Sequence, residues 1–126
     1  MHTIDRLMTA IAANNKAKGF RDRDLNVGEV LMLITSELGE AMEAHRTNKF
    51  AKVEQFKAAI NKLTYIDENW CREFKENIKD TFEDELADAF IRLLDLAERT
   101  GVDLSYHVQE KMTYNATRPR LHGKAY

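Results

Sequence analysis

The stretch "ITSELGEAMEA", residues 34–44, decides how this chain is expected to fold. Its apolar residues recur at helical spacing, which predicts an amphipathic helix. Because a helix turns by about 100° per residue, Glu37 falls inside the apolar stripe, between Leu33 and Ala41. Glu40 lies about 60° away, at the rim of that stripe. One acid at the edge of the core, with a second one beside it, indicates a candidate binding site rather than a solvated helix surface.

A second stretch, "FEDELADAFIRLL" at residues 82–94, repeats this arrangement. Glu85 lies beside the apolar residues of its helix, and Asp88 lies about 60° away on the same side as Glu40 does on the first helix. Either motif alone is common on solvated helices. The repetition at matching angles favours a site, because the four acids converge if the two apolar stripes pack against each other.

A converging cluster of carboxylates needs compensation. Two unit charges about 4 Å apart repel by about 4 kcal/mol at an effective dielectric near 20, and a whole domain is stable by only about 5–15 kcal/mol. Protons or cations must therefore neutralise the cluster. Oxygen ligands alone suit Mg²⁺ or Mn²⁺. Di-iron bundles add a Glu-x-x-His motif, and none of the four histidines here follows a glutamate at that spacing.

Composition predicts one all-α domain, residues 1–126. The chain is 32% charged and 44% hydrophobic, and a single proline and five glycines leave few turn signals for strands. A net charge of −2 argues against a nucleic-acid partner. Cys71 is the only cysteine, which excludes an internal disulfide. No run of apolar residues approaches the length of a membrane span, about 20 residues. We therefore expect no membrane partner, and a cytoplasmic location.

Start and stop signals predict four main helices and two shorter ones. The main helices are expected at about Thr3–Lys18, from the N-cap Asn26 to about Arg46, from Asp80 to just before Gly101, and from the N-cap Asp103 to just before Pro119. Residues 47–79 are expected to hold two short amphipathic helices, "FAKVEQFKAAINKL" and "YIDENWCREFKENI". The tail "RPRLHGKAY" is expected to be a loop.

Basic residues supply candidates for binding phosphate. Lys111, Asn115 and Arg118 are spaced i, i+4 and i+7, so the last two lie within about 40° of Lys111 on one face, and the three form a reasonable clamp for a polyphosphate. The alternative is that they are ordinary solvated helix residues. Arg92 lies four residues after Asp88. It either pairs with the acids or reaches a phosphate.

The ordered set of motifs resembles the MazG-like, all-α nucleoside triphosphate pyrophosphohydrolases. Their E-x-x-E…E-x-x-D signature is similar to "ELGE" at 37–40 and "ELAD" at 85–88. Further similarity covers both ends of the chain and most predicted helices, in the segments "KAKGF" (16–20), "NVGEVLMLITSELGEAMEAHR" (26–46) and "KMTYNATRPRLHGK" (111–124).

The resemblance implies a four-helix-bundle-like fold with a helical insertion, residues 47–79, between the second and the last-but-one main helices. It implies cleavage of a nucleoside triphosphate, for example a dNTP, to the monophosphate and pyrophosphate. It also implies a homodimer or homotetramer. The ligands of Mg²⁺, or of Mn²⁺ in its place, would be Glu37, Glu40, Glu85 and Asp88. Lys111 and Asn115 would bind the phosphates or the sugar, helped by Arg118 and Lys124.

Two departures from the family pattern bear on mechanism. Ser36 stands where many members have a further glutamate that is a candidate base, so Glu40, with Glu37 beside it, is the expected catalytic carboxylate. The spacer between the two motifs is also longer than is typical. Nothing in the sequence distinguishes dUTP, dCTP or dGTP. The alternative function is a non-catalytic nucleotide- or metal-binding regulatory bundle.

Overall fold

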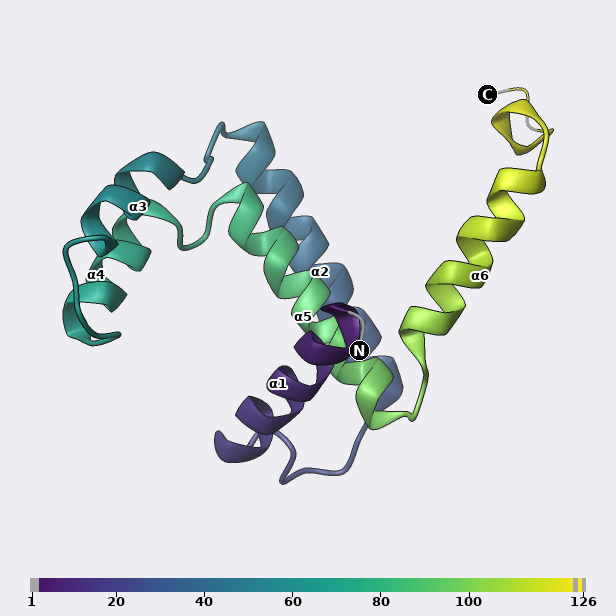
Figure 1. Ribbon diagram of the computed structural model, residues 1–126, viewed down its shortest axis with the longest axis horizontal. Coiled ribbons are helices and arrows are strands. Elements are labelled where there is room, and N and C mark those ends of the chain that lie inside the picture. Colours follow the sequence, from purple (N-terminus) through teal and green to yellow (C-terminus); the bar gives the residue numbers. More distant parts are fainter. Residues whose placement is uncertain (1–2, 124, 126) are drawn as a thin grey trace. The chain divides into compact units, whose positions relative to one another are not determined.

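The computed structural model describes residues 3–123 and 125, and every regular element in that part of the chain is helical (Figure 1). The predicted all-α class is confirmed. The elements are α1 (Thr3–Ala17), α2 (Val27–Arg46), α3 (Val53–Ile60), α4 (Glu68–Asn77), α5 (Phe82–Arg99), α6 (Leu104–Thr117) and a 3-10 helix (Arg120–Gly123). Within the described residues, no helix combines the length and the apolarity that crossing a membrane requires.

Two predicted helix caps are present. The Asn26 side chain accepts a hydrogen bond from the backbone N–H of Glu29 at 3.0 Å, and Asp103 accepts one from Tyr106 at 3.2 Å. Each cap satisfies one of the backbone donors that a helix start leaves without a partner. The sequence therefore located the beginnings of α2 and α6 correctly.

The predicted start of α5 at Asp80 is wrong. Asp80 has a φ of 64°, in the left-handed region, and the helix begins at Phe82. Thr81 serves as the cap instead, since its hydroxyl accepts from the N–H of Asp84 at 3.4 Å and donates to the carbonyl of Ile78 at 2.6 Å. An aspartate tolerates the left-handed conformation in a turn as readily as it caps a helix, so sequence alone did not separate the two.

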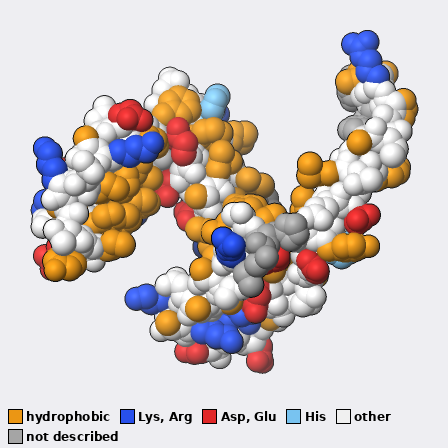
Figure 2. Space-filling view, viewed as in Figure 1, with side chains coloured by type: hydrophobic (Ala, Val, Ile, Leu, Met, Phe, Trp, Pro, Cys, Tyr) orange, Lys and Arg blue, Asp and Glu red, His pale blue; other side chains and the backbone are white. Residues whose placement is uncertain are grey.

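Residues 47–79 form two short helices, α3 and α4, as predicted. Aromatic rings pack α3 on α4, with Phe56 5.6 Å from Trp70 and 5.9 Å from Phe74 between ring centroids. Figure 2 shows hydrophobic side chains gathered on the surface of these two helices. The tail was predicted to be a loop, but Arg120–Gly123 forms one turn of 3-10 helix. Such turns need only i→i+3 hydrogen bonds and are common in short connecting segments.

The chain divides into two compact units, with the boundary inside α5. We call Asn26–Leu93 the central unit, and the described residues of Met1–Leu25 and Leu94–Tyr126 the terminal unit. The core of the terminal unit consists of Met8, Leu94 and Ala97, against which Ile4, Ile11 and Leu104 pack.

In the central unit, α2 and α5 lie side by side and run in opposite directions (Figure 1). The residues buried on their facing sides are small or acidic, namely Glu37, Ala41 and Ala44 on α2 and Glu85 and Ala89 on α5. The N–H of Phe82 donates to the carbonyl of Lys49 at 2.9 Å, which ties the end of α2 to the start of α5. This packing turns the two acidic motifs toward each other.

One side of the α2–α5 pair exposes large apolar side chains. Around the axis of its own helix, each of them is rotated by about 80–140° from Glu37 (on α2) or Glu85 (on α5). Because the two helices are antiparallel and Glu37 and Glu85 face each other, the same rotation leads to the same side of the pair. Glu40 and Asp88, at about −60°, point to the opposite side. We call this set the apolar face: Leu31 (48% exposed), Leu38 (50%), Met42 (63%), Leu86 (43%), Phe90 (43%) and Leu93 (40%).

Candidate functional site

Three carboxylates meet between α2 and α5. Glu37 and Glu40 lie three residues, or about one turn, apart on α2, and Glu85 lies in the first half of α5. One carboxylate oxygen from each lies within 4.8 Å of the others. The structure thus brings together three of the four acids that the sequence singled out.

Glu85 is the most deeply buried of the three. Only 5% of the residue is exposed, and its Oε2 atom is buried with no hydrogen-bond partner. Burial, reinforced by the neighbouring Glu37 and Glu40, raises the pKa of Glu85 to about 8. A buried acceptor without a donor carries a desolvation cost, which a proton or a cation at this oxygen would relieve.

Glu37 is held in the opposite protonation state. Burial raises the pKa of Glu37, but the hydrogen bond and charge of Arg92, together with the hydrogen bonds to Glu85 and Glu40, outweigh burial and lower the net pKa below the usual range. Arg92 donates from Nε to Oε1 of Glu37 at 3.0 Å, and the Arg92 side chain is 42% exposed. Of the two roles considered for Arg92, pairing with the acids is therefore present.

Asp88 does not belong to the three-carboxylate group. It lies one turn after Glu85, half-buried. Burial raises the pKa of Asp88, and so do the charges of Asp84 and Glu37, while Arg92 opposes them. Asp88 therefore senses the negative potential of the group without sharing its centre.

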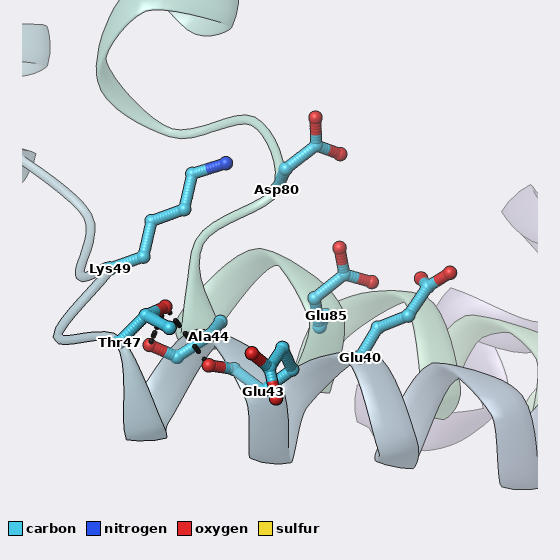
Figure 3. A pocket seen from close by; sticks show the side chains of 7 residues that line it. All are labelled: Glu40, Glu43, Ala44, Thr47, Lys49, Asp80 and Glu85. Carbon is cyan, nitrogen blue, oxygen red and sulfur yellow. Dashed lines mark hydrogen bonds between the residues drawn. The ribbon is translucent and has the colours of Figure 1, made fainter.

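An open pocket of ≈ 300 Å³ adjoins the carboxylates (Figure 3). In Figure 3 the side chains of Glu40, Glu85 and Lys49 extend to the same side of α2. The residues that line the pocket are Glu40, Glu43, Ala44, Thr47, Lys49, Asp80 and Glu85. Sequence reasoning missed Lys49 here because it lies in a connection outside the helical pattern, and it missed Asp80 because that residue was expected to begin a helix. The only local signal is Asn48, a residue that often ends helices.

The predicted phosphate-binding residues of α6 lie in the terminal unit. Lys111 lies on α6, but Arg118, predicted on the same helix face, is the extended C-cap residue that follows Thr117. Both cations nevertheless lie near one ring, with the Lys111 Nζ 5.0 Å and the Arg118 Cζ 5.5 Å from the centroid of Tyr114. The Oδ1 atom of Asn115 is buried without a hydrogen-bond partner. Lys124 lies outside the described residues. Assignment of these side chains to the substrate of the acidic site stays a prediction.

The carboxylate group fits a hard divalent cation. All three donors are oxygens, one of them buried and without a partner, and one held ionised by an arginine. Mg²⁺ is commonly bound by few carboxylates and completes its shell with waters and substrate phosphates. The open pocket beside Glu40 and Glu85 leaves space for such additional ligands.

Comparison of the chain with protein-family models, curated proteins and solved structures finds no match. The resemblance to MazG-like enzymes therefore rests on the motifs and their order along the chain. The structure adds an all-α fold and a carboxylate group formed by those motifs.

Proposed function

We propose that the chain is a Mg²⁺-dependent nucleoside triphosphate pyrophosphohydrolase of the MazG-like kind. One observation carries the proposal: the buried, unpartnered Oε2 of Glu85 lies in a group with Glu37 and Glu40 whose ligand oxygens are within 4.8 Å of one another. Carboxylates in this arrangement favour a divalent cation, and a cation beside an open pocket favours a polyphosphate substrate.

Glu37, Glu40 and Glu85 would hold the cation, with Asp88 adding negative potential one turn away. A bound Mg²⁺ supplies charge neutralisation for phosphate oxygens and makes a water more acidic. Glu37 is suited to a purely ligating role, since Arg92 keeps it ionised and occupies one of its oxygens.

Glu40 is the better candidate for orienting the attacking water. It is exposed, it lines the pocket, and it follows Glu37 by one turn. Ser36, where many relatives have an acid, donates its hydroxyl to the carbonyl of Leu33 at 2.8 Å. A serine hydroxyl used in this way is no substitute for a carboxylate base.

Lys111, Asn115, Arg118 and Lys124 are proposed to contact the phosphates or the sugar. Arg92 is proposed to act there indirectly, through the charge of Glu37. The substrate class is a nucleoside triphosphate, for example a dNTP, cleaved between the α- and β-phosphates.

We also propose that the chain forms a homodimer or homotetramer. The apolar face of α2 and α5 supports this, since six large hydrophobic side chains on one side of a helix pair are exposed by 40–63%. Contiguous apolar surface of this kind marks interaction sites, and two-fold association is the commonest arrangement.

Product analysis tests the proposed reaction. The purified protein is incubated with each dNTP and Mg²⁺, and the products are separated. Monophosphate and pyrophosphate are expected from at least one nucleotide. Release of orthophosphate would exclude the proposed bond, whereas nucleotide binding without turnover would favour a non-catalytic regulatory bundle.

A further inference from the structure

The acidic pocket contains one basic side chain that no motif predicted. Of the residues that line the pocket, four are acids and Lys49 alone is basic. Its side chain extends to the same side of α2 as those of Glu40 and Glu85 (Figure 3). Building on the proposed function, we infer that Lys49 binds a phosphate group of the substrate at this pocket.

The backbone of Lys49 is anchored on both sides. α2 ends in a Schellman motif, in which Asn48 adopts a φ of 58° and the N–H of Lys49 donates to the carbonyl of Ala44 at 2.8 Å. The carbonyl of Lys49 accepts from the N–H of Phe82 at 2.9 Å. The lysine is therefore presented from a fixed point at the junction of the two acid-bearing helices.

An aromatic cluster strengthens this junction. His45 lies 5.5 Å from Phe50 and 5.2 Å from Phe82 between ring centroids, and the two phenylalanine rings are 6.1 Å apart. Edge-to-face contacts of this kind stabilise the positions of the rings. Because Phe50 follows Lys49 directly, the cluster limits how far the lysine can move from the pocket.

The ammonium group has no acidic partner in the described part of the chain. No carboxylate there lies within 4.0 Å of its Nζ, although four acids line the same pocket; Lys79, by contrast, lies 3.5 Å from Asp80. The separation leaves space for an anion between Lys49 and the carboxylates. Lysine is a compact charge with three donors, which suits phosphate oxygens on the side opposite a metal ion.

Titration with inorganic pyrophosphate distinguishes phosphate binding by Lys49 from a role in which Lys49 only balances the charge of the neighbouring acids. Inorganic pyrophosphate is titrated into the Mn²⁺-loaded full-length protein by calorimetry, after Mn²⁺ alone has been titrated. Lys49→Ala should weaken pyrophosphate binding about ten- to hundredfold, the usual range for a hydrogen bond to a charged group. Lys49→Arg should recover part of the affinity. Lys62→Ala, an exposed lysine after α3, is the matched control and should bind as the unmodified protein does.

The outcomes distinguish the inference from the proposed function. Mn²⁺ should bind Lys49→Ala at least as tightly as the unmodified protein, because a nearby positive charge has been removed. Equal pyrophosphate affinity in Lys49→Ala, or a loss of equal size in Lys62→Ala, would overturn the inference alone. If the unmodified protein binds no Mn²⁺, both the proposed function and the inference about Lys49 fail. Failure of pyrophosphate to bind the loaded protein would also reject the role of Lys49.

Discussion

Arg92 on α5 donates from its Nε to Oε1 of Glu37 on α2, at 3.0 Å. This ion pair crosses between the two helices that carry the acidic motifs. It keeps one of three neighbouring carboxylates ionised while burial and the other two acids push Glu85 toward its protonated form. The group therefore combines a fixed charge with a protonated acid whose proton a cation can displace.

Replacing Arg92 should weaken metal binding. In Arg92→Ala the burial of Glu37 is no longer opposed by the guanidinium, so the pKa of Glu37 rises and a proton competes with the cation. We expect Mn²⁺ affinity to fall severalfold at pH 6 and the loss to disappear at pH 8, where the proton no longer competes and the removal of a nearby positive charge favours the cation. Calorimetry measures this, with Arg72→Ala in α4 as control. An equal loss at both pH values would contradict the mechanism.

Removing the Glu85 charge should have opposite effects without and with metal. Glu85→Gln keeps the shape of the side chain but cannot ionise, so at pH 9 in EDTA the repulsion with Glu37 and Glu40 disappears. The thermal midpoint should rise by about 3 °C or more, since about 1 kcal/mol shifts it by several degrees in a small domain. Added Mg²⁺ should no longer stabilise the variant. Glu54→Gln, at an exposed residue of α3, is the control and should change neither the thermal midpoint in EDTA nor its increase on addition of Mg²⁺.

The stability of the metal-free protein should fall as the pH rises through about 8. The pKa of Glu85 is raised above its unfolded value of 4.5, so its contribution is fully present below pH 4.5 and is lost as the pH passes its folded value. The pKa of Asp88 is also raised and acts in the same direction. Glu37 has a lowered pKa, so its contribution is instead lost in acid, below about pH 4.5.

Denaturant unfolding in EDTA between pH 5 and 9 measures this dependence. A second series in saturating Mg²⁺ should be flatter, because the cation replaces the proton at the carboxylates. A metal-free protein whose unfolding free energy increases from pH 6 to 9 would show that Glu85 is not in the environment described.

Glu40→Gln should separate folding from turnover. Glu40 is exposed, so at neutral pH in EDTA the substitution should leave the free energy of unfolding within about 0.5 kcal/mol of the unmodified protein. Turnover of the preferred nucleotide should fall about 10²–10⁴-fold, the usual contribution of a general base. Pyrophosphate release in the steady state is the measurement, and Glu43→Gln on the same pocket is the comparison. Retained turnover would remove Glu40 from the catalytic role.

Charge on the apolar face should disrupt association. Leu38 is 50% exposed and about 100° from Glu37 on α2, on the side opposite Glu40. Leu38→Glu should shift the mass in multi-angle light scattering toward the monomer, since an unpaired charge in an apolar interface is costly. Glu29→Gln near the start of α2 is the control. A monomeric unmodified protein at micromolar concentration would reject the proposed homo-oligomer.

Helical periodicity determined much of this protein without reference to tertiary structure. The spacing of apolar residues placed Glu37 and Glu85 on inward-facing sides of their helices, and side-chain caps located the starts of α2 and α6. These features depend on contacts within about four residues, which a sequence displays directly. The misplaced start of α5 shows the limit, since Asp80 suits a cap and a left-handed turn equally well.

Only the tertiary structure decided which polar groups meet. It paired Arg92 with Glu37, left Asp88 outside the group of three acids, and placed Lys49 beside the pocket through the left-handed Asn48 and the bond from Phe82. Each of these depends on residues that are more than thirty positions apart or on a turn with no repeating pattern. Helical spacing fixes the direction in which a side chain leaves its own helix, but the packing of the second helix and the path of the connection determine what it contacts.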